Sequence, residues 1–265
     1  MKKTVWIIIA IVILLGLLGC KKKEEKLPSK ETASAITTYA PLPSFKEVFR
    51  VLDKLQVKDI SAAVPADIYK TKQEEVRNAF SLGLLTADAT LAAKGHNKKR
   101  LSQISSRMMD LTTLLGLENE VNQMSAELKK LIEKEQWTEL EAALDNHKKN
   151  VEDKLWEMES FDNYTLMLFG GWVEAANRVA WLIKQNYSAE QTKALYQKGT
   201  FNSLVNNLKN IKTERITSQP EFQEALGLVE QLKAVIDADK DQTYTPEQLD
   251  QIISLTNQIK ETFKK

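Results

Sequence analysis

The sequence predicts an all-α protein, either an antiparallel multi-helix bundle or an array of helical hairpins, with eight or nine helices. Apolar residues recur at steps of three and four along most of the chain, and no convincing run of alternating residues predicts a sheet. No proline occurs between Pro65 and Pro220, which favours long helices because proline interrupts them. The 265-residue chain is 43% hydrophobic, enough for one sizeable core.

The expected helices follow one another along the chain, each with its apolar residues on one face. In order, these segments are 48–55, 76–91, 101–115, 121–131, 140–158, 168–183, 204–211, 228–235 and 249–263. Candidate capping boxes mark helix starts, because a Ser or Thr followed three residues later by Glu or Gln satisfies the exposed amides of a first helical turn. These boxes are Ser44/Glu47, Thr138/Glu141, Ser188/Gln191, Ser218/Glu221 and Thr245/Gln248.

A short apolar run at the N-terminus predicts export. Two lysines precede apolar residues 5–18, a run of signal-peptide length that is too short to span a membrane stably. The run ends in Leu-Leu-Gly-Cys at 17–20, which resembles the lipobox of bacterial lipoproteins. The resemblance implies that residues 1–19 are removed and that the thiol of Cys20, the chain's only cysteine, carries diacylglycerol. The alternative is an ordinary secretory signal or a membrane helix with an incidental cysteine.

Residues 20–43 are expected to be a flexible tether between the lipid anchor and a helical domain at 44–265. They begin with charged residues and continue rich in Ser, Thr, Ala and Pro, with too little apolar content to fold alone. Lys21 is unlike the Asp that retains many lipoproteins at the inner membrane, and Lys-Glu-Glu at 23–25 resembles a signal for the cell surface. A merely soluble, charged tether is the alternative. We expect a lipid-anchored envelope protein at the outer membrane, facing the periplasm or the surface.

Charge and motifs exclude several function classes. The formal net charge is +1, and removal of residues 1–19 takes away two of the 37 basic residues but none of the 36 acidic ones. Such a chain has no net attraction for nucleic acid, so no nucleic-acid partner is expected. The sequence has neither a dinucleotide fingerprint nor a P-loop, and its cysteine and two histidines cannot make a zinc site. We predict no cofactor and no enzymatic activity.

Two segments combine glycine and alanine four residues apart, Gly83 with Ala87 and Gly171 with Ala175. A glycine inside a helix costs about 1 kcal/mol relative to alanine, so a packing reason is expected, and such a flat stripe lets another backbone come close. We predict that both helices approach their neighbours at unusually short distance.

The same segments carry a family resemblance. Phe-x-Leu-Gly at 80–83 followed by Ala-Asp at 87–88, and Gly-Gly-Trp-x-Glu at 170–174, are similar to segments of a family of uncharacterised all-helical bacterial lipoproteins. The resemblance covers roughly residues 65–185. It implies an exported, all-helical lipoprotein and supplies no catalytic residue. Thr86 stands where an aromatic residue is common in that family.

A candidate ligand pocket is predicted around the second of these segments. Glu174 and Arg178 are four residues apart and can pair on one side of a helix, while Asp88 lies in an apolar setting. The predicted pocket consists of Asp88, Trp172, Glu174, Asn177, Arg178 and Trp181. The alternative is a structural network of ion pairs between tightly packed helices, since buried charges are usually paired for structural reasons.

Two weaker hypotheses concern a metal and a histidine. Asp237, Asp239 and Asp241 resemble the start of an EF-hand calcium loop, but glutamine occupies its sixth and twelfth positions, so a solvated turn between two helices is the alternative. His147 lies on the apolar side of its helix, where we expect an interhelical residue with satisfied hydrogen bonds.

The sequence therefore favours a non-enzymatic, lipid-anchored helical protein of the cell envelope that acts as a binding or scaffold module. Its expected partners are a membrane, reached through the lipid anchor, and either a protein or a small ligand. The alternative function is an envelope receptor for a small ligand or for calcium.

Overall fold

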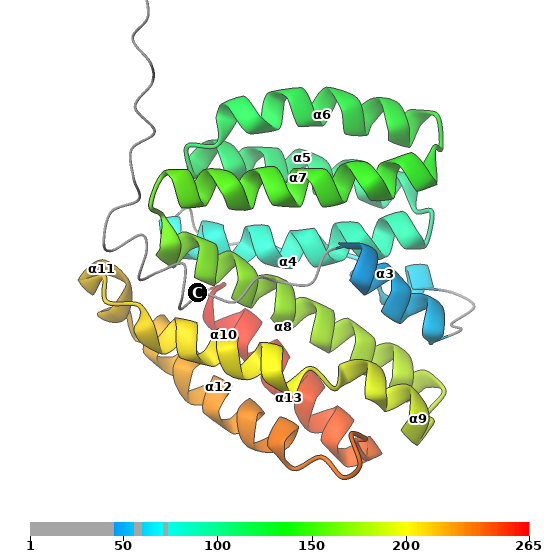
Figure 1. The fold of residues 1–265 in the computed structure, drawn as a ribbon, viewed down its shortest axis with the longest axis vertical. Coiled ribbons are helices and arrows are strands. Elements are labelled where there is room, and N and C mark those ends of the chain that lie inside the picture. Colours follow the sequence, from blue (N-terminus) through cyan, green and yellow to red (C-terminus); the bar gives the residue numbers. More distant parts are fainter. Residues whose placement is uncertain (1–44, 56–59, 71–73, 265) are drawn as a thin grey trace, which may run out of the picture. The chain divides into compact units, whose positions relative to one another are not determined.

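A computed structural model describes residues 45–55, 60–70 and 74–264, which belong to one compact unit, residues 38–265. The described residues are all-α as predicted, with one isolated β-bridge, between Lys240 and Thr243 (Figure 1). The predicted signal peptide, Cys20 and the tether lie outside the described residues. No helix in the described part of the chain is both long enough and apolar enough to cross a membrane.

Most of the helices are long, whereas α9 and α11 have only four residues each, and the number of long helices agrees with the prediction. They are α3 (Phe45–Lys54), α4 (Glu75–Lys94), α5 (Lys98–Leu114), α6 (Glu118–Glu133), α7 (Trp137–Glu157), α8 (Phe161–Gln185), α9 (Ala189–Thr192), α10 (Lys198–Asn210), α11 (Glu214–Thr217), α12 (Pro220–Asp237) and α13 (Pro246–Thr262). Two 3₁₀ turns, η1 (Ile60–Ala63) and η2 (Lys193–Leu195), lie between them.

Helices α4 to α8 reverse direction through four turns of the same kind. The second residue after each helix has positive φ, at His96, Gly116, Glu135 and Glu159, and the N–H of the residue that follows it donates to a carbonyl five residues back. This backbone geometry closes a helix and turns the chain sharply. Three of the four residues are not glycine, although the left-handed conformation costs other residues about 1 kcal/mol. The short turns place successive helices antiparallel.

Helix α8 is the centre of the domain, and most of its side chains are buried. Its most extensive contact is with α4, followed by α13. Figure 1 shows α5, α6 and α7 on one side of the α4–α8 pair and α12 and α13 on the other. The rings of Phe80, Phe169 and Phe263 join α4, α8 and the chain's last turn, with centroids 4.1 Å apart for Phe80 and Phe263. The core therefore forms around α8.

Helices α4 and α8 touch backbone to backbone. A Cβ atom placed on Gly83 would lie 1.9 Å from the carbonyl oxygen of Met167, and one on Gly170 would lie 2.0 Å from that of Phe80. No side chain fits at either distance. The predicted close approach is confirmed, with two differences: the two helices are each other's neighbours, and in α8 the contact is at Gly170, next to the predicted Gly171.

Among the predicted capping boxes within the described residues, one has both hydrogen bonds: Thr245 with Gln248, at the start of α13. Three others lack the hydrogen bonds of a capping box: α7 begins at Trp137, before the predicted Thr138, and α12 starts after Gln219. Ser188 is the N-cap of α9, as predicted, but its side chain makes no capping bond. In two of these three, the chain starts its helix at a neighbouring position. Ser44 lies outside the described residues.

Candidate functional site

Four charged side chains meet in the interior between α4, α8 and α13. Glu174 on α8 is 2% exposed, and its Oε1 accepts a hydrogen bond of 2.5 Å from Arg178 Nε. Its Oε2 lies 2.8 Å from Lys260 Nζ of α13. Asp88 on α4 is equally buried and shares a hydrogen bond with Glu174. The structure thus brings Asp88, Glu174 and Arg178 together, and it adds Lys260, which the sequence did not predict.

The two buried carboxyl groups of this cluster have pKa values shifted in opposite directions. Burial raises the pKa of Asp88 well above its usual range, and the negative charge of Glu174 raises it further. Burial acts on Glu174 in the same direction, but Lys260 and Arg178 outweigh it and lower the pKa of Glu174. The two pKa shifts favour a protonated Asp88 beside an ionised Glu174, whose carboxylate faces Arg178 and Lys260. This geometry fits the alternative of a structural ion network.

Asn177 and the two tryptophans of the predicted pocket also make structural contacts. The Nδ2 of Asn177 donates to Thr256 Oγ1 of α13 at 2.8 Å, among other acceptors on that helix. The Trp172 ring lies against Phe201 of α10, with centroids 4.2 Å apart. Trp181 is half-buried and packs against the core. These contacts hold α8 to α10 and α13.

A small cavity of about 290 Å³ lies beside α8, bordered by α3, α4 and the start of α10. Trp172 and Arg178 line it, whereas the other four residues of the predicted pocket do not. Of the ion cluster, only Arg178 therefore contributes to the wall of this cavity. A ligand pocket built from all six residues stays a prediction.

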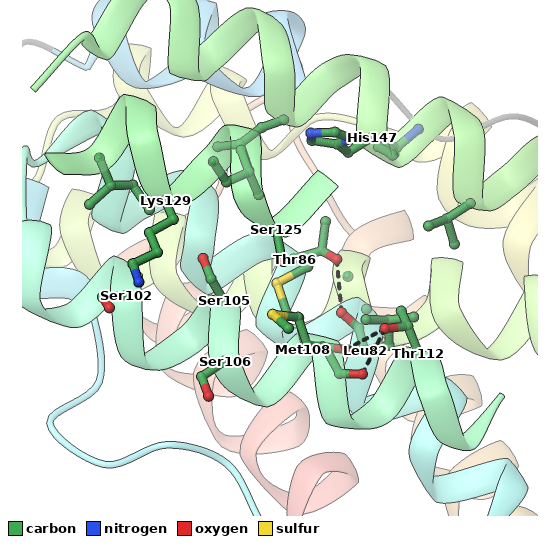
Figure 2. A pocket seen from close by; sticks show the side chains of 18 of the residues that line it. Leu82, Thr86, Ser102, Ser105, Ser106, Met108, Thr112, Ser125, Lys129 and His147 are labelled. Carbon is green, nitrogen blue, oxygen red and sulfur yellow. Dashed lines mark hydrogen bonds between the residues drawn. The ribbon is translucent and has the colours of Figure 1, made fainter. Parts of the chain in front are cut away.

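A larger cavity, of about 680 Å³, lies among α5, α6 and α7, next to the contact between α4 and α8 (Figure 2). Its volume falls in the range of about 300 to 1,000 Å³ that is typical of small-molecule sites. The apolar part of its wall includes Leu82, Met108, Leu128, Ile132, Val151 and Met167. The polar part carries serine hydroxyls, lysines and His147. This cavity is the candidate site that the structure supports best.

His147 enters the wall of the larger cavity from α7 (Figure 2). It is 7% exposed, and neither ring nitrogen has a hydrogen-bond partner among the described residues. Its Nε2 lies 3.6 Å from Glu127 Oε2, too far for a hydrogen bond. Burial lowers the pKa of His147, and Glu127 opposes the shift. The expectation of a satisfied interhelical histidine is therefore wrong: a cavity lies where a polar partner was expected.

The acidic residues after α12 form a turn and not a group of metal ligands. Lys198 Nζ lies 2.7 Å from Asp239 Oδ1 and 3.7 Å from Asp237 Oδ1. The hydrogen bond from Lys198 lowers the pKa of Asp239, and the amide of Gln242 donates to its other oxygen. Asp241 is exposed and has a positive φ. Among the described residues, no three acidic, histidine or cysteine side chains are close enough to hold a metal ion, so the solvated-turn alternative fits best.

The chain matches no protein-family model, no curated protein and no solved structure. The resemblance to uncharacterised helical lipoproteins therefore stays a prediction.

The sequence did not predict the larger cavity. Met108 and its neighbours follow the helical spacing of core residues, and nothing in that spacing shows whether the space between three helices is filled. The available signal was the face of α5 that carries Ser102, Ser105 and Ser106 beside this apolar stripe. Three hydroxyls close to a buried seam favour a wall that contacts something other than protein.

Proposed function

We propose that the protein is a lipid-anchored binding module of the cell envelope, whose helical domain takes a small, largely apolar molecule into the cavity among α5, α6 and α7. The observation that carries the proposal is the cavity of about 680 Å³ itself, because a domain of this size otherwise fills its interior closely. The lipobox-like sequence at 17–20 supports the anchor. Catalysis is not part of the proposal.

The shape and position of the cavity support binding in preference to a scaffold role alone. Its apolar wall comes from five helices, so it is a concave site fixed by the fold and not by one mobile loop. Met108, Met109 and Met167 all line it. Methionine side chains adapt to ligands of different outline, because they are unbranched and their thioether is polarizable.

The binding part of the proposal can be tested on the full-length protein in phosphatidylcholine nanodiscs. A photoreactive twelve-carbon alcohol is added and activated, and the labelled peptides are mapped by mass spectrometry. We expect label on peptides that contain Met108, Leu128 or Val151. Label spread evenly over the surface, or confined to the nanodisc-facing anchor, would contradict the proposal.

A matched pair of variants locates the label. Ser105→Trp places a large ring at the half-buried cavity wall, whereas Ser254→Trp places the same ring at an exposed position on α13. Labelling of cavity peptides should fall at least fivefold in the first variant and stay unchanged in the second. A melting temperature close to that of the wild type in both variants shows that the comparison is between folded proteins.

The anchor is tested separately. Cells fed radioactive palmitate should label the wild-type protein but not Cys20→Ser, and the wild-type protein should fractionate with membranes. An unlabelled wild-type protein would remove the lipid anchor from the proposal and leave the cavity unaffected.

A further inference from the structure

The wall of the larger cavity has two parts: apolar side chains line its inside, and lysine and serine side chains lie at one border. Lys98, Lys99 and Lys129 lie at this border and are exposed, while Leu128 and Ile132 are buried. Two other apolar wall residues, Met108 and Met109, are half-buried. A site with this division fits a molecule that has an apolar body and one polar end. A wholly apolar ligand would leave the polar border unused.

The sign of the border is positive after its ion pairs are counted. Lys98 donates to the Glu133 carbonyl at 3.0 Å and lies 3.6 Å from Glu135 Oε1, and Lys148 lies 2.7 Å from Glu152 Oε1. Two lining lysines remain, Lys99 and Lys129, and neither has an ion-pair partner among the described residues. Glu133 is the acidic residue that lines the same cavity. The uncompensated charge therefore favours an anion.

The hydroxyl groups of α5 continue this border. Ser102, Ser105 and Ser106 are spaced by three and four residues, so they share one face of the helix. Figure 2 shows these serines on the side of the cavity where Lys129 extends from α6. None of the three makes a side-chain hydrogen bond within the described part of the chain, so their O–H groups are available to donate to an anionic oxygen.

We propose that the cavity binds a single-chain amphiphile with an anionic headgroup, its charged end between Lys99 and Lys129 beside the α5 serines and its hydrocarbon chain along Met108, Leu128 and Met167. This inference rests on the proposed function and specifies the ligand class of the same site. The cavity volume suits one chain, and the buried wall removes that chain from water, which stabilises it by ~0.8 kcal/mol per methylene. The shared chemistry is one acyl or alkyl chain with one anionic end.

The test is competition against the photoreactive alcohol in the full-length protein, in nanodiscs of neutral lipid. Dodecanoate, dodecyl phosphate and dodecanol have the same chain and differ in the head. We expect the two anions to compete at concentrations about tenfold lower than dodecanol at low salt, and the advantage to shrink in 0.5 M sodium chloride because salt screens exposed charges. The better of the two anions assigns the headgroup as a carboxylate or a phosphate.

A double variant tests the position of the head. Lys99→Gln with Lys129→Gln should raise the dodecanoate concentration needed for half-competition about tenfold and change that of dodecanol less than twofold. The matched control, Lys130→Gln with Lys134→Gln, removes the same charge from exposed positions of α6 and its end that do not line the cavity. It should change neither value more than twofold.

The outcomes separate this inference from the proposed function. Equal competition by dodecanol and both anions, or equal weakening in the two double variants, would overturn the anionic ligand and keep an apolar site. If the photoreactive alcohol labels no cavity peptide at all, both the anionic ligand and the proposed binding function are overturned. All four lysines are exposed, so their replacement is not expected to unfold the domain.

Discussion

The contact between α4 and α8 and the layer of α5, α6 and α7 solve the packing of neighbouring helices in opposite ways. At Gly83 and Gly170 no space remains even for a methyl group, and charges that reach the interior are paired. Among α5, α6 and α7 a cavity of about 680 Å³ remains, lined partly by hydroxyls and by a histidine with unsatisfied nitrogens. One region is therefore closely packed, and the other keeps the space that the proposed ligand would occupy.

The difference between the regions arises from side-chain size and not from the connections between the helices. Short turns join α4 through α8, so both regions are held by the same kind of chain reversal. Glycines on α4 and α8 allow the backbones to meet, whereas α5 contributes serines and methionines to the cavity wall. Each of the following substitutions should therefore have a different effect in the two regions.

The largest effect is expected at the α4–α8 contact. Gly83→Ala places a Cβ atom 1.9 Å from the Met167 carbonyl oxygen, a backbone atom that cannot move without shifting the helix. The free energy of unfolding should fall by more than about 3 kcal/mol, measured by urea unfolding. Gly227→Ala is the control, since Gly227 is an exposed position of α12 and nothing lies within 4 Å of its Cβ position. This substitution should raise the free energy of unfolding by ~0.5 to 1 kcal/mol. Equal effects at both glycines would show that α4 and α8 can separate at little cost.

Gly83 also shows how far the sequence predicts this fold. A glycine inside an apolar helical pattern predicts that another helix comes close to it, and this prediction could be made from the sequence. Which glycine of α8 makes the contact, Gly170 or Gly171, depends on how the two helices cross, and the sequence does not show that. Asp88, Glu174 and Arg178 were grouped correctly because two of them are one helical turn apart and the third lies in an apolar setting. Lys260 was missed because it lies beside core residues of a helix far away in the chain, where its long side chain predicts exposure.

The second effect concerns the buried ion cluster. Glu174→Gln removes the negative charge that faces Arg178 and Lys260 and should cost about 3 to 5 kcal/mol, because it leaves buried cations uncompensated. Asp88→Asn should cost less than about 1 kcal/mol at pH 5, since burial and Glu174 raise the pKa of Asp88 and an amide, like a protonated carboxyl, can donate to Glu174. Urea unfolding of both variants at pH 5 measures the two losses in the free energy of unfolding.

The pH dependence of the same pair gives a second readout. The pKa of Asp88 is higher in the folded protein than in the unfolded chain, because of burial and the charge of Glu174. Its contribution to stability is therefore fully present below the unfolded pKa of about 3.9 and is lost as the pH rises. The melting temperature of Asp88→Asn should thus increase relative to that of the wild type between pH 4 and pH 8. A constant difference would mean that Asp88 is not protonated in the fold.

A third, smaller effect tests the open region. Ser105→Leu adds an apolar side chain at a half-buried position whose neighbouring space is the cavity, so no atom has to move. The free energy of unfolding should change by less than about 1 kcal/mol, in contrast to the much smaller substitution at Gly83. Urea unfolding in the absence of lipid measures it. A loss of several kcal/mol would show that the α5–α7 layer is packed as tightly as the α4–α8 contact, and the proposed site would then lack the room it needs.

The smallest effect concerns His147 in the cavity wall and the change of the melting temperature with pH near neutrality. Burial lowers the pKa of His147 in the fold, against the opposing charge of Glu127. The stability that depends on its neutral form is fully present above the unfolded pKa of about 6.5 and is lost as the pH falls through the folded pKa. The decline in melting temperature between pH 7.5 and pH 5.5 should therefore be shallower in His147→Gln than in the wild type. The exposed His96 is the other histidine of the chain, and a slope that followed His96→Gln instead would contradict the assignment. Asp88 lies at the α4–α8 contact and His147 in the cavity wall, so Asp88→Asn and His147→Gln should change the pH dependence of the melting temperature independently. Additive changes in the variant that carries both substitutions would show that the tight contact and the open layer titrate as separate units.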